Sequence, residues 1–290
     1  MSNSILDIET ALKLKGFNFR NNSKVRGYKS GIHKSYYNGI SPDFLEHTEY
    51  NRGDELKQID WRLYGRHDRL YVKKFEDEVN MRWCILIDKS ASMGYGDKGY
   101  NKFEYAKRLC ATLAYLLLKQ GDSVGLVAFS EEDIELIPSR AGSHFITPIL
   151  DKLETLKPSG STGLKDPVLK ALESYRSDAS FVMMSDFLID SEIVEQSIKL
   201  IRNSKKEISL FHVLHPDETE FNFSGSIEFE DLETSEKMIV DTDSLRHTYR
   251  KRVMEFIDNL KHICHENETR YVFSPTNQTI EKSLIQIADK

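Results

Sequence analysis

Blocks of apolar residues alternate along this chain with stretches in which apolar residues recur at helical spacing. Largely apolar runs at residues 83–87, 123–129, 181–184 and 208–214 predict strands that are covered on both faces. Between them, apolar residues at helical spacing predict packed helices, the longest of which ends at Gly121. This alternation predicts an α/β domain with a doubly wound, mostly parallel sheet.

The last third of the chain interrupts this alternation. After the fifth expected strand, residues 226–232 and 237–241 have the pattern of a β-hairpin, inserted at about residues 221–241. A long, charged helix at residues 244–266 follows, then a strand at 271–273 and a terminal helix. Shorter elements complete the expected domain, with an edge strand at residues 134–138 and helices at 145–156, 166–175 and 192–203.

Composition divides the chain into an appendage, residues 1–79, and a main domain, residues 80–290. Residues 21–41 are rich in Asn, Ser, Lys, Gly and Tyr, as expected of an extended or loop segment. An amphipathic helix at residues 4–15 should precede this segment and dock on the main domain, with Ser4 as its N-cap. Its apolar face would hold Ile5, Ile8 and Leu12, with Leu14 off that face.

Charge and composition exclude several classes of protein. The formal net charge of −6 provides no global basic field of the kind that binds nucleic acid. No apolar run is long enough for a membrane span, and the N-terminus lacks a signal-peptide pattern, so we expect a soluble protein of the cytoplasm. The three cysteines, Cys84, Cys110 and Cys264, show no paired spacing, which fits a reducing compartment.

Five side chains with oxygen donors lie at positions suited to a metal ion. Asp88, Ser90 and Ser92 alternate in the loop after the strand at 83–87, and Asp186 ends a second apolar strand. Thr162 lies in a Gly/Ser loop before a helical stretch. The carboxyl edge of an open α/β sheet is where ligands bind, and hard oxygen donors there suit Mg²⁺, with Mn²⁺ and Ca²⁺ as the other candidates.

The order of these donors resembles a von Willebrand factor A domain with its metal-ion-dependent adhesion site. All five positions of that motif are filled, by Asp88, Ser90, Ser92, Thr162 and Asp186. The resemblance implies that the hydroxyls contact the metal directly and that the carboxylates often act through bound waters. It also implies an open metal position, which an Asp or Glu of a partner or client protein fills.

A second resemblance covers residues 30 to 290 and depends on the block before the main domain. The segments Tyr50-x-x-Gly53-Asp54, Ile59-Asp60-Trp61 and Leu70-x-Val72-Lys73-x-Phe75-Glu76 look like the signature of the family of domain of unknown function 58. Members of that family are associated with MoxR-type AAA+ ATPases, so the resemblance implies an adaptor in chaperone-like assembly or remodelling. The signature residues that we expect to serve partner contacts are Tyr50, Gly53, Asp54, Asp60, Trp61 and Arg66.

Two other functions remain open. A metal-dependent hydrolase would use the cation to activate water and would need a general base, for which Asp186, His33 and His144 are the candidates. A metal-free scaffold would hold its partners through residues 50–76 alone. Because the sequence shows no Ser-His-Asp order, nucleophile elbow, P-loop or HExxH motif, we expect a binding protein and not an enzyme.

Two further groups of polar residues are expected to be structural. Acidic residues interleave the basic residues Arg62, Arg66, Arg69, Lys73 and Lys74, which favours a solvated face with local ion pairs. A zinc site at His262, Cys264 and His265 is not expected, because positions i, i+2 and i+3 of one helix converge poorly and no fourth ligand is near.

Overall fold

The computed structural model describes residues 5–17, 19, 43–50, 59–67, 69–76, 81–97, 101–175, 178–233 and 236–288. The chain forms two compact units, one of residues 1–24 and 81–290 and the other of residues 25–80. This division differs from the predicted one at the N-terminus, because the first helix belongs to the larger unit and not to the appendage.

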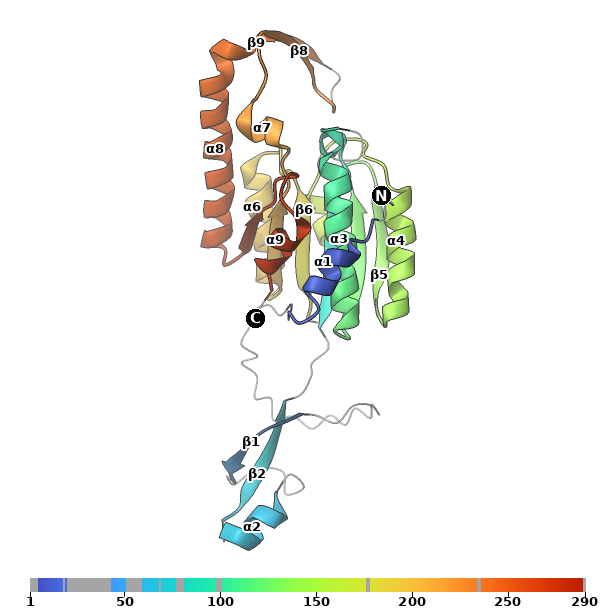
Figure 1. Cartoon of the computed structure of the whole chain (residues 1–290), viewed down its shortest axis with the longest axis vertical. Coiled ribbons are helices and arrows are strands. Elements are labelled where there is room, and N and C mark those ends of the chain that lie inside the picture. Colours follow the sequence, from blue (N-terminus) through green and yellow to red (C-terminus); the bar gives the residue numbers. More distant parts are fainter. Residues whose placement is uncertain are drawn as a thin grey trace. The chain divides into compact units, whose positions relative to one another are not determined.

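The larger unit is built around a sheet of six strands in the order β10-β7-β6-β3-β4-β5 (Figure 1). All neighbouring strands are parallel except β5, which runs antiparallel to β4 at the edge. The predicted doubly wound, mostly parallel sheet is therefore confirmed. The strands are β3 (Arg82–Asp88), β4 (Ser123–Phe129), β5 (Ile134–Ala141), β6 (Ser180–Ser185), β7 (Glu207–His212) and β10 (Arg270–Phe273).

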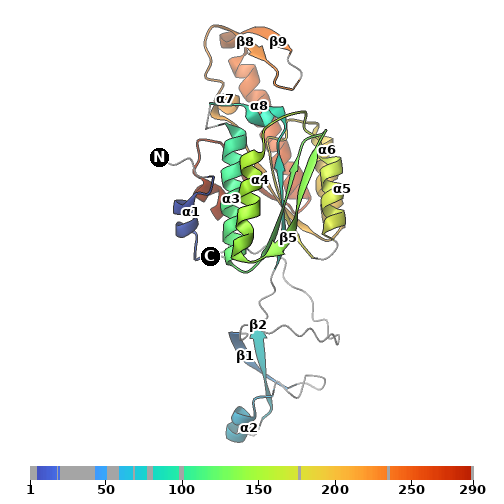
Figure 2. The same ribbon diagram turned by 90° about the vertical axis from the view of Figure 1, so that its right-hand side faces the viewer.

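Helices cover both faces of this sheet, as Figure 2 shows. One face carries α1 (Ile8–Lys13), α3 (Lys102–Lys119), α4 (Ile146–Thr155) and α9 (Ile280–Ile285). The other carries α5 (Lys165–Ser174), α6 (Ser191–Asn203) and α8 (Thr242–Glu266).

The central strand β3 contributes side chains to the apolar clusters on both faces of the sheet, because successive side chains of a strand point to opposite faces. Trp83, Ile85 and Ile87 pack into one apolar cluster, and Cys84 and Leu86 pack into the other. All five side chains are buried, so β3 is fixed on both faces up to its last residue.

The first helix differs from its prediction in both its start and its buried face. Its N-cap is Asp7, whose Oδ1 accepts a hydrogen bond from the Thr10 amide at 2.9 Å. The predicted apolar face is correct for Ile5, which packs against the core, but wrong for Ile8 and Leu12, which are exposed, at 59% and 67%. Ala11 and Leu14 are buried instead, because docking against α3 selects the buried side of so short a helix.

The predicted hairpin insertion is present after β7, the fifth strand of the sheet along the chain. A short helix, α7 (Pro216–Glu220), leads into β8 (Ser226–Glu230) and β9 (Lys237–Asp241), which pair antiparallel. The long helix α8 follows β9 directly, so the hairpin is continuous with α8.

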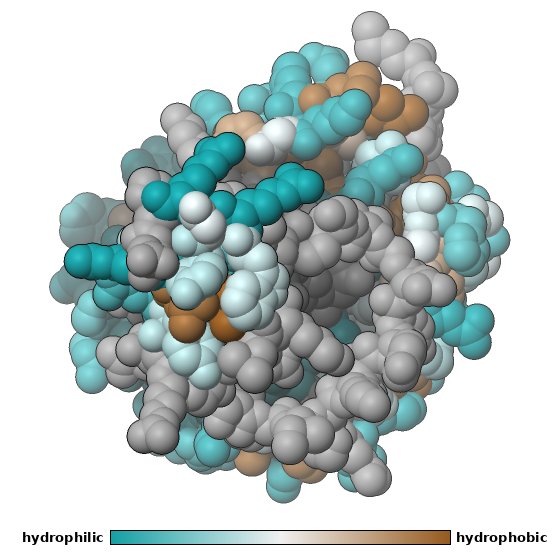
Figure 3. Space-filling model, turned by 90° about the horizontal axis from the view of Figure 1, so that it is seen from below, coloured by the Kyte–Doolittle hydropathy of each residue, from teal (hydrophilic) through white to brown (hydrophobic). Residues whose placement is uncertain are grey.

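The smaller unit contains the antiparallel strands β1 (Asp43–Glu49) and β2 (Tyr71–Glu76) and the helix α2 (Trp61–His67). Asp60 begins α2, because its Oδ1 accepts hydrogen bonds from the amides of Arg62 and Leu63, at 2.9 and 3.2 Å. In the described part of the chain, no helix is long and apolar enough to cross a membrane. The coloured surface in Figure 3 is mostly hydrophilic, with hydrophobic residues in small groups.

Candidate metal centre

The centre lies where two neighbouring parallel strands end. In the β3–β6 pair, Ile87 lies opposite Met184, so Asp88 and Ser185 follow at the same level of the sheet. Asp88, Ser185 and Asp186 are completely buried. The parallel register therefore brings together two predicted carboxylates that lie far apart in the sequence.

The carboxylate of Asp88 is fixed by hydrogen bonds to both of its oxygens. Oδ1 accepts from the Ser90 amide at 2.8 Å, and Oδ2 accepts from the Ser185 hydroxyl at 2.6 Å. The Thr162 hydroxyl lies 3.4 Å from Oδ2. Ser185 also accepts a hydrogen bond from the Phe187 amide at 2.9 Å, so it links the ends of both strands.

The hydroxyls of Ser90 and Ser92 lie 3.0 Å apart. Adjacent ligands of an octahedral Mg²⁺ ion with metal–oxygen distances of about 2.1 Å are about 3.0 Å apart. The spacing of these two hydroxyls therefore fits neighbouring positions on such an ion.

Three backbone hydrogen bonds hold the loop of Thr162 beside the centre. Its loop pairs with the loop after β3, through Ser159 N to Lys89 O at 2.7 Å and Ala91 N to Gly160 O at 2.8 Å. On the other side, Glu131 N donates to Ser161 O at 2.8 Å. Gly160 has φ of +74°, which favours glycine, and it gives the loop the turn that these bonds require.

A buried lysine, which the sequence analysis missed, contacts the second carboxylate. The Lys102 ammonium lies 2.7 Å from Asp186 Oδ2 and 2.6 Å from Glu218 Oε1. Lys102 is the first residue of α3 and is completely buried, and Glu218 belongs to α7. In the sequence it looks like an ordinary polar residue at the start of a helix, so no local signal identifies it.

The cluster carries more negative than positive charge. Asp88, Asp186 and Glu218 bring three carboxylates against the one ammonium of Lys102. Burial and the neighbouring Asp186 raise the pKa of Asp88 to about 7, and burial raises the pKa of Glu218. A divalent cation among these groups would offset this excess, and the carboxylate and hydroxyl donors suit a hard ion such as Mg²⁺.

The predicted signature residues fall in the smaller unit or outside the described residues. Asp60 caps α2 and lies 3.0 Å from His47 Nε2 through its Oδ2, and both of these contacts lie within the smaller unit. Trp61 is 62% exposed and packs edge-on against Tyr64. Tyr50 donates its amide to Leu70, and Arg66 is exposed. Gly53, Asp54 and His33 lie outside the described residues.

The two other polar groups are the His262, Cys264 and His265 group and the basic group in the smaller unit. In the described residues, no three side chains of His, Cys, Asp or Glu gather in a metal-holding arrangement. Cys264 is buried, whereas the side chain of His265 is 86% exposed. In the basic group, Arg69 pairs with Glu49 at 3.1 Å. The side chains of Lys73 and Lys74 lie outside the description.

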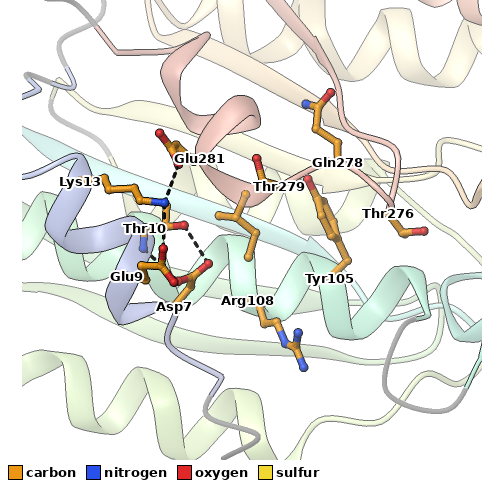
Figure 4. Close-up of a pocket in the computed structure, with 11 residues that line it drawn as sticks. Asp7, Glu9, Thr10, Lys13, Tyr105, Arg108, Thr276, Gln278, Thr279 and Glu281 are labelled. Atoms are coloured by element: carbon orange, nitrogen blue, oxygen red, sulfur yellow. Dashed lines mark hydrogen bonds and ion pairs between the residues drawn. The ribbon is translucent and has the colours of Figure 1, made fainter. Parts of the chain in front are cut away.

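A polar pocket lies beside α1, α3 and the segment that leads into α9 (Figure 4). Lys13 reaches from α1 to Glu9 at 2.9 Å and to Glu281 at 3.4 Å, and Asp7 bonds Thr10. None of the five predicted donors lines this pocket, and its acidic residues are engaged within it. We therefore assign the pocket no part in the candidate centre.

Comparison with known families gives one match across most of the chain. A family model described as "Protein of unknown function DUF58" matches residues 46–256. An uncharacterized protein of Mycobacterium bovis is 22% identical over 232 residues, which is 79% of this chain and 72% of the relative. An uncharacterized protein of Mycobacterium tuberculosis matches to the same extent.

Three solved structures are similar to most of this chain. An aerotolerance-related membrane protein from Bacteroides fragilis has a TM-score of 0.50 at 19% identity, over 72% of this chain and 98% of that one, and it shows the shared fold. BatB from Bacteroides thetaiotaomicron has a TM-score of 0.49 at 16% identity, over 72% and 97%. The SpRpn10 VWA domain has 0.45 at 14% identity, over 71% and 94%. The predicted von Willebrand factor A-like fold is confirmed by the sheet order, with its antiparallel strand at the edge.

Proposed function

Because this chain belongs to the DUF58 family, we propose that it is a metal-dependent protein–protein interaction module that works as an adaptor for a MoxR-type AAA+ ATPase. The observation that carries the proposal is the convergence of Asp88, Ser90, Ser92, Thr162 and Asp186 at one edge of the sheet. Three hydrogen-bonded contacts link members of this set, at 2.8, 3.0 and 3.4 Å.

The hydroxyls and the carboxylates of the set have different roles in the proposal. The hydroxyls of Ser90, Ser92 and Thr162 would hold the ion, and Asp88 and Asp186 would balance its charge. When bound, Mg²⁺ supplies a positive charge and a position that a carboxylate oxygen of another protein can take. Ser185 keeps Asp88 oriented through its 2.6 Å hydrogen bond. Lys102 keeps one oxygen of Asp186 engaged.

The partner class comes from the family resemblance and the chemistry of the site. The resemblance implies a MoxR-type ATPase, and the site would recognise a client that offers an Asp or Glu side chain. Together the two proteins would act in chaperone-like assembly, remodelling or metal insertion. The proposed setting is the cytoplasm, where the ATPase has its nucleotide.

We favour binding over hydrolysis because the candidate base Asp186 is held in an ion pair with Lys102 and because His144 lies away from the centre. His144 follows β5, whose last residue Ala141 pairs with Ser123, the first residue of β4. It therefore lies at the amino edge of the parallel strands, opposite the centre. Phosphatase and peptidase assays with and without Mg²⁺ test the choice, and we expect no turnover.

The test of the proposed function is a pull-down from native lysate with the full chain as bait, in Mg²⁺ and in EDTA. We expect an AAA+ ATPase to be retained only with Mg²⁺, and Asp88→Asn to abolish this retention. Asp151→Asn is the control, since Asp151 is exposed on α4. Equal retention in both buffers and by both variants would contradict the metal-dependent proposal and favour the metal-free scaffold.

A further inference from the structure

Both carboxylates of the centre have oxygens engaged in contacts within the protein. Each oxygen of Asp88 accepts a short hydrogen bond, at 2.8 and 2.6 Å. Asp186 Oδ2 lies 2.7 Å from the Lys102 ammonium, whereas its Oδ1 accepts a longer hydrogen bond, of 3.3 Å, from the Leu188 amide. Neither carboxylate can therefore offer both of its oxygens to one ion unless one of these contacts breaks.

Lys102 is held at Asp186 by a second carboxylate and by the start of its own helix. Glu218 Oε1 lies 2.6 Å from the ammonium, and Glu218 Oε2 accepts a hydrogen bond from the His215 amide at 2.7 Å. The Lys102 amide donates to Tyr95 O at 3.1 Å. The side chains of Lys102 and Asp186 are both completely buried. Separating them would leave a buried charge with fewer partners, which is a costly change.

Ca²⁺ and Mg²⁺ differ in the ligands that they need from a protein. Ca²⁺ takes about six to eight oxygen ligands and can bind a carboxylate through both oxygens, whereas Mg²⁺ requires a near-ideal octahedron and keeps several waters. With Lys102 on its Oδ2, Asp186 has its Oδ1 left for an ion or for a water of that ion. A centre with few protein oxygens in fixed positions suits the smaller, hydrated Mg²⁺.

We propose that Lys102 makes the centre selective for Mg²⁺ over Ca²⁺, by keeping Asp186 from binding one ion through both of its oxygens. The inference rests on the metal site of the proposed function, and it decides between two ions that the sequence leaves open. The observation that carries it is the buried contact between Lys102 and Asp186. An ion that needs more protein oxygens has to pull Asp186 away from the ammonium, and this cost is larger for Ca²⁺ than for Mg²⁺.

The test measures Mg²⁺ and Ca²⁺ affinity by calorimetry with the full chain. The wild type should bind Mg²⁺ more tightly than Ca²⁺. Lys102→Met removes a positive charge and should raise both affinities, but it should raise that for Ca²⁺ more. The ratio of Mg²⁺ to Ca²⁺ affinity should fall by about 10–100-fold, the range typical for changes in a group that supports a metal ligand. Equal affinities in the wild type, or an unchanged ratio in Lys102→Met, would overturn the inference.

The double variant Lys102→Met/Glu218→Gln separates the effect of the contact from the effect of net charge. It removes one positive and one negative charge, so the formal charge of the cluster is unchanged, but Asp186 Oδ2 is still released from the ammonium. The ratio should fall as it does in Lys102→Met, and the double variant takes the place of the single one if that chain fails to fold. A double variant with the wild-type ratio would overturn the inference.

Lys107→Met is the matched control, because Lys107 is a lysine of the same helix that pairs with Glu104 at 2.7 Å and has a side chain only 7% exposed. Both affinities should remain those of the wild type, and a fall of the ratio as large as in Lys102→Met would overturn the inference. Mg²⁺ binding with a ratio that Lys102→Met leaves unchanged overturns this inference alone. A wild-type chain that binds neither ion would overturn the proposed function and the inference with it.

Discussion

The ammonium of Lys102 lies 2.7 Å from Oδ2 of Asp186, and both side chains are completely buried. The contact joins the first turn of α3 to the end of β6, so the protein places a positive charge of its own beside a predicted metal donor. Asp186 Oδ1 accepts a hydrogen bond from the Leu188 amide at 3.3 Å. The ion pair thus orients Asp186 and lowers the negative charge that a metal would have to balance.

Replacing Lys102 by Met should destabilise the metal-free protein by about 3–5 kcal/mol, the typical cost of leaving a buried charge without its partner. The same change should increase the stabilisation that Mg²⁺ provides, because the centre then carries one more uncompensated negative charge. Urea unfolding with and without Mg²⁺ measures both effects. The double variant Lys102→Met/Glu218→Gln should recover part of the lost stability, and a single variant as stable as the wild type would contradict the prediction.

Replacing Asp88 by Asn should abolish stabilisation by Mg²⁺. In the wild type, Mg²⁺ at 100 times its dissociation constant should add about 2.7 kcal/mol to the free energy of unfolding, and EDTA should remove it. The metal-free variant should be at least as stable as the wild type, because burial and Asp186 disfavour the ionised Asp88. Urea titration of both proteins provides the measurement, and an Asp88→Asn chain that Mg²⁺ still stabilises would refute the assignment of this residue.

Replacing Ser185 by Ala should weaken the centre although Ser185 is not one of the predicted donors. Its hydroxyl bonds Asp88 and the Phe187 amide, so its loss should cost about 1–3 kcal/mol of stability. Mg²⁺ affinity should fall about 10–100-fold because Asp88 loses its orientation. Ser180→Ala, at the other end of β6 and also buried, is the control and should leave Mg²⁺ affinity unchanged. Calorimetric titration of both variants decides between them.

Replacing Tyr249 by Ala should loosen the hairpin and leave the sheet intact. The ring of Tyr249 packs on Phe221, and an aromatic pair of this kind contributes about 0.5–1.5 kcal/mol. Limited proteolysis should therefore cut faster within residues 221–241, with the rest of the domain still resistant. Tyr249→Phe keeps the ring and should behave as the wild type. Equal cutting of all three proteins would show that the aromatic contact does not hold the hairpin.

The elements that depend on local pattern can be predicted from the sequence alone. The apolar run at residues 83–87 identifies a central strand, since covered strands need apolar residues on both faces. Asp88, Ser90 and Ser92 lie in the loop that directly follows, and Thr162 and Asp186 occupy comparable loop and strand-end positions. Their nearness in space follows from the parallel sheet, which places the carboxyl ends of its strands at one edge.

The pattern of apolar residues did not predict which face of α1 is buried, because packing against other elements determines that face. Periodicity assigned Ile8 and Leu12 to the buried side of α1, but Ala11 and Leu14 are the residues that pack against the domain. A helix of this length has little stability of its own, so its contacts with α3 and α9 decide which side is buried.

Long-range packing brings Lys102, Ser185 and Glu218 to the centre. Lys102 meets Asp186 because α3 begins beside the end of β6, and Glu218 reaches the same ammonium from α7. Their residue types are common on any protein surface, and their sequence neighbours indicate no binding role. A donor at a strand end can be predicted from the sequence because the strand itself places it. A group that orients that donor depends on long-range packing, and packing exists only in the folded chain.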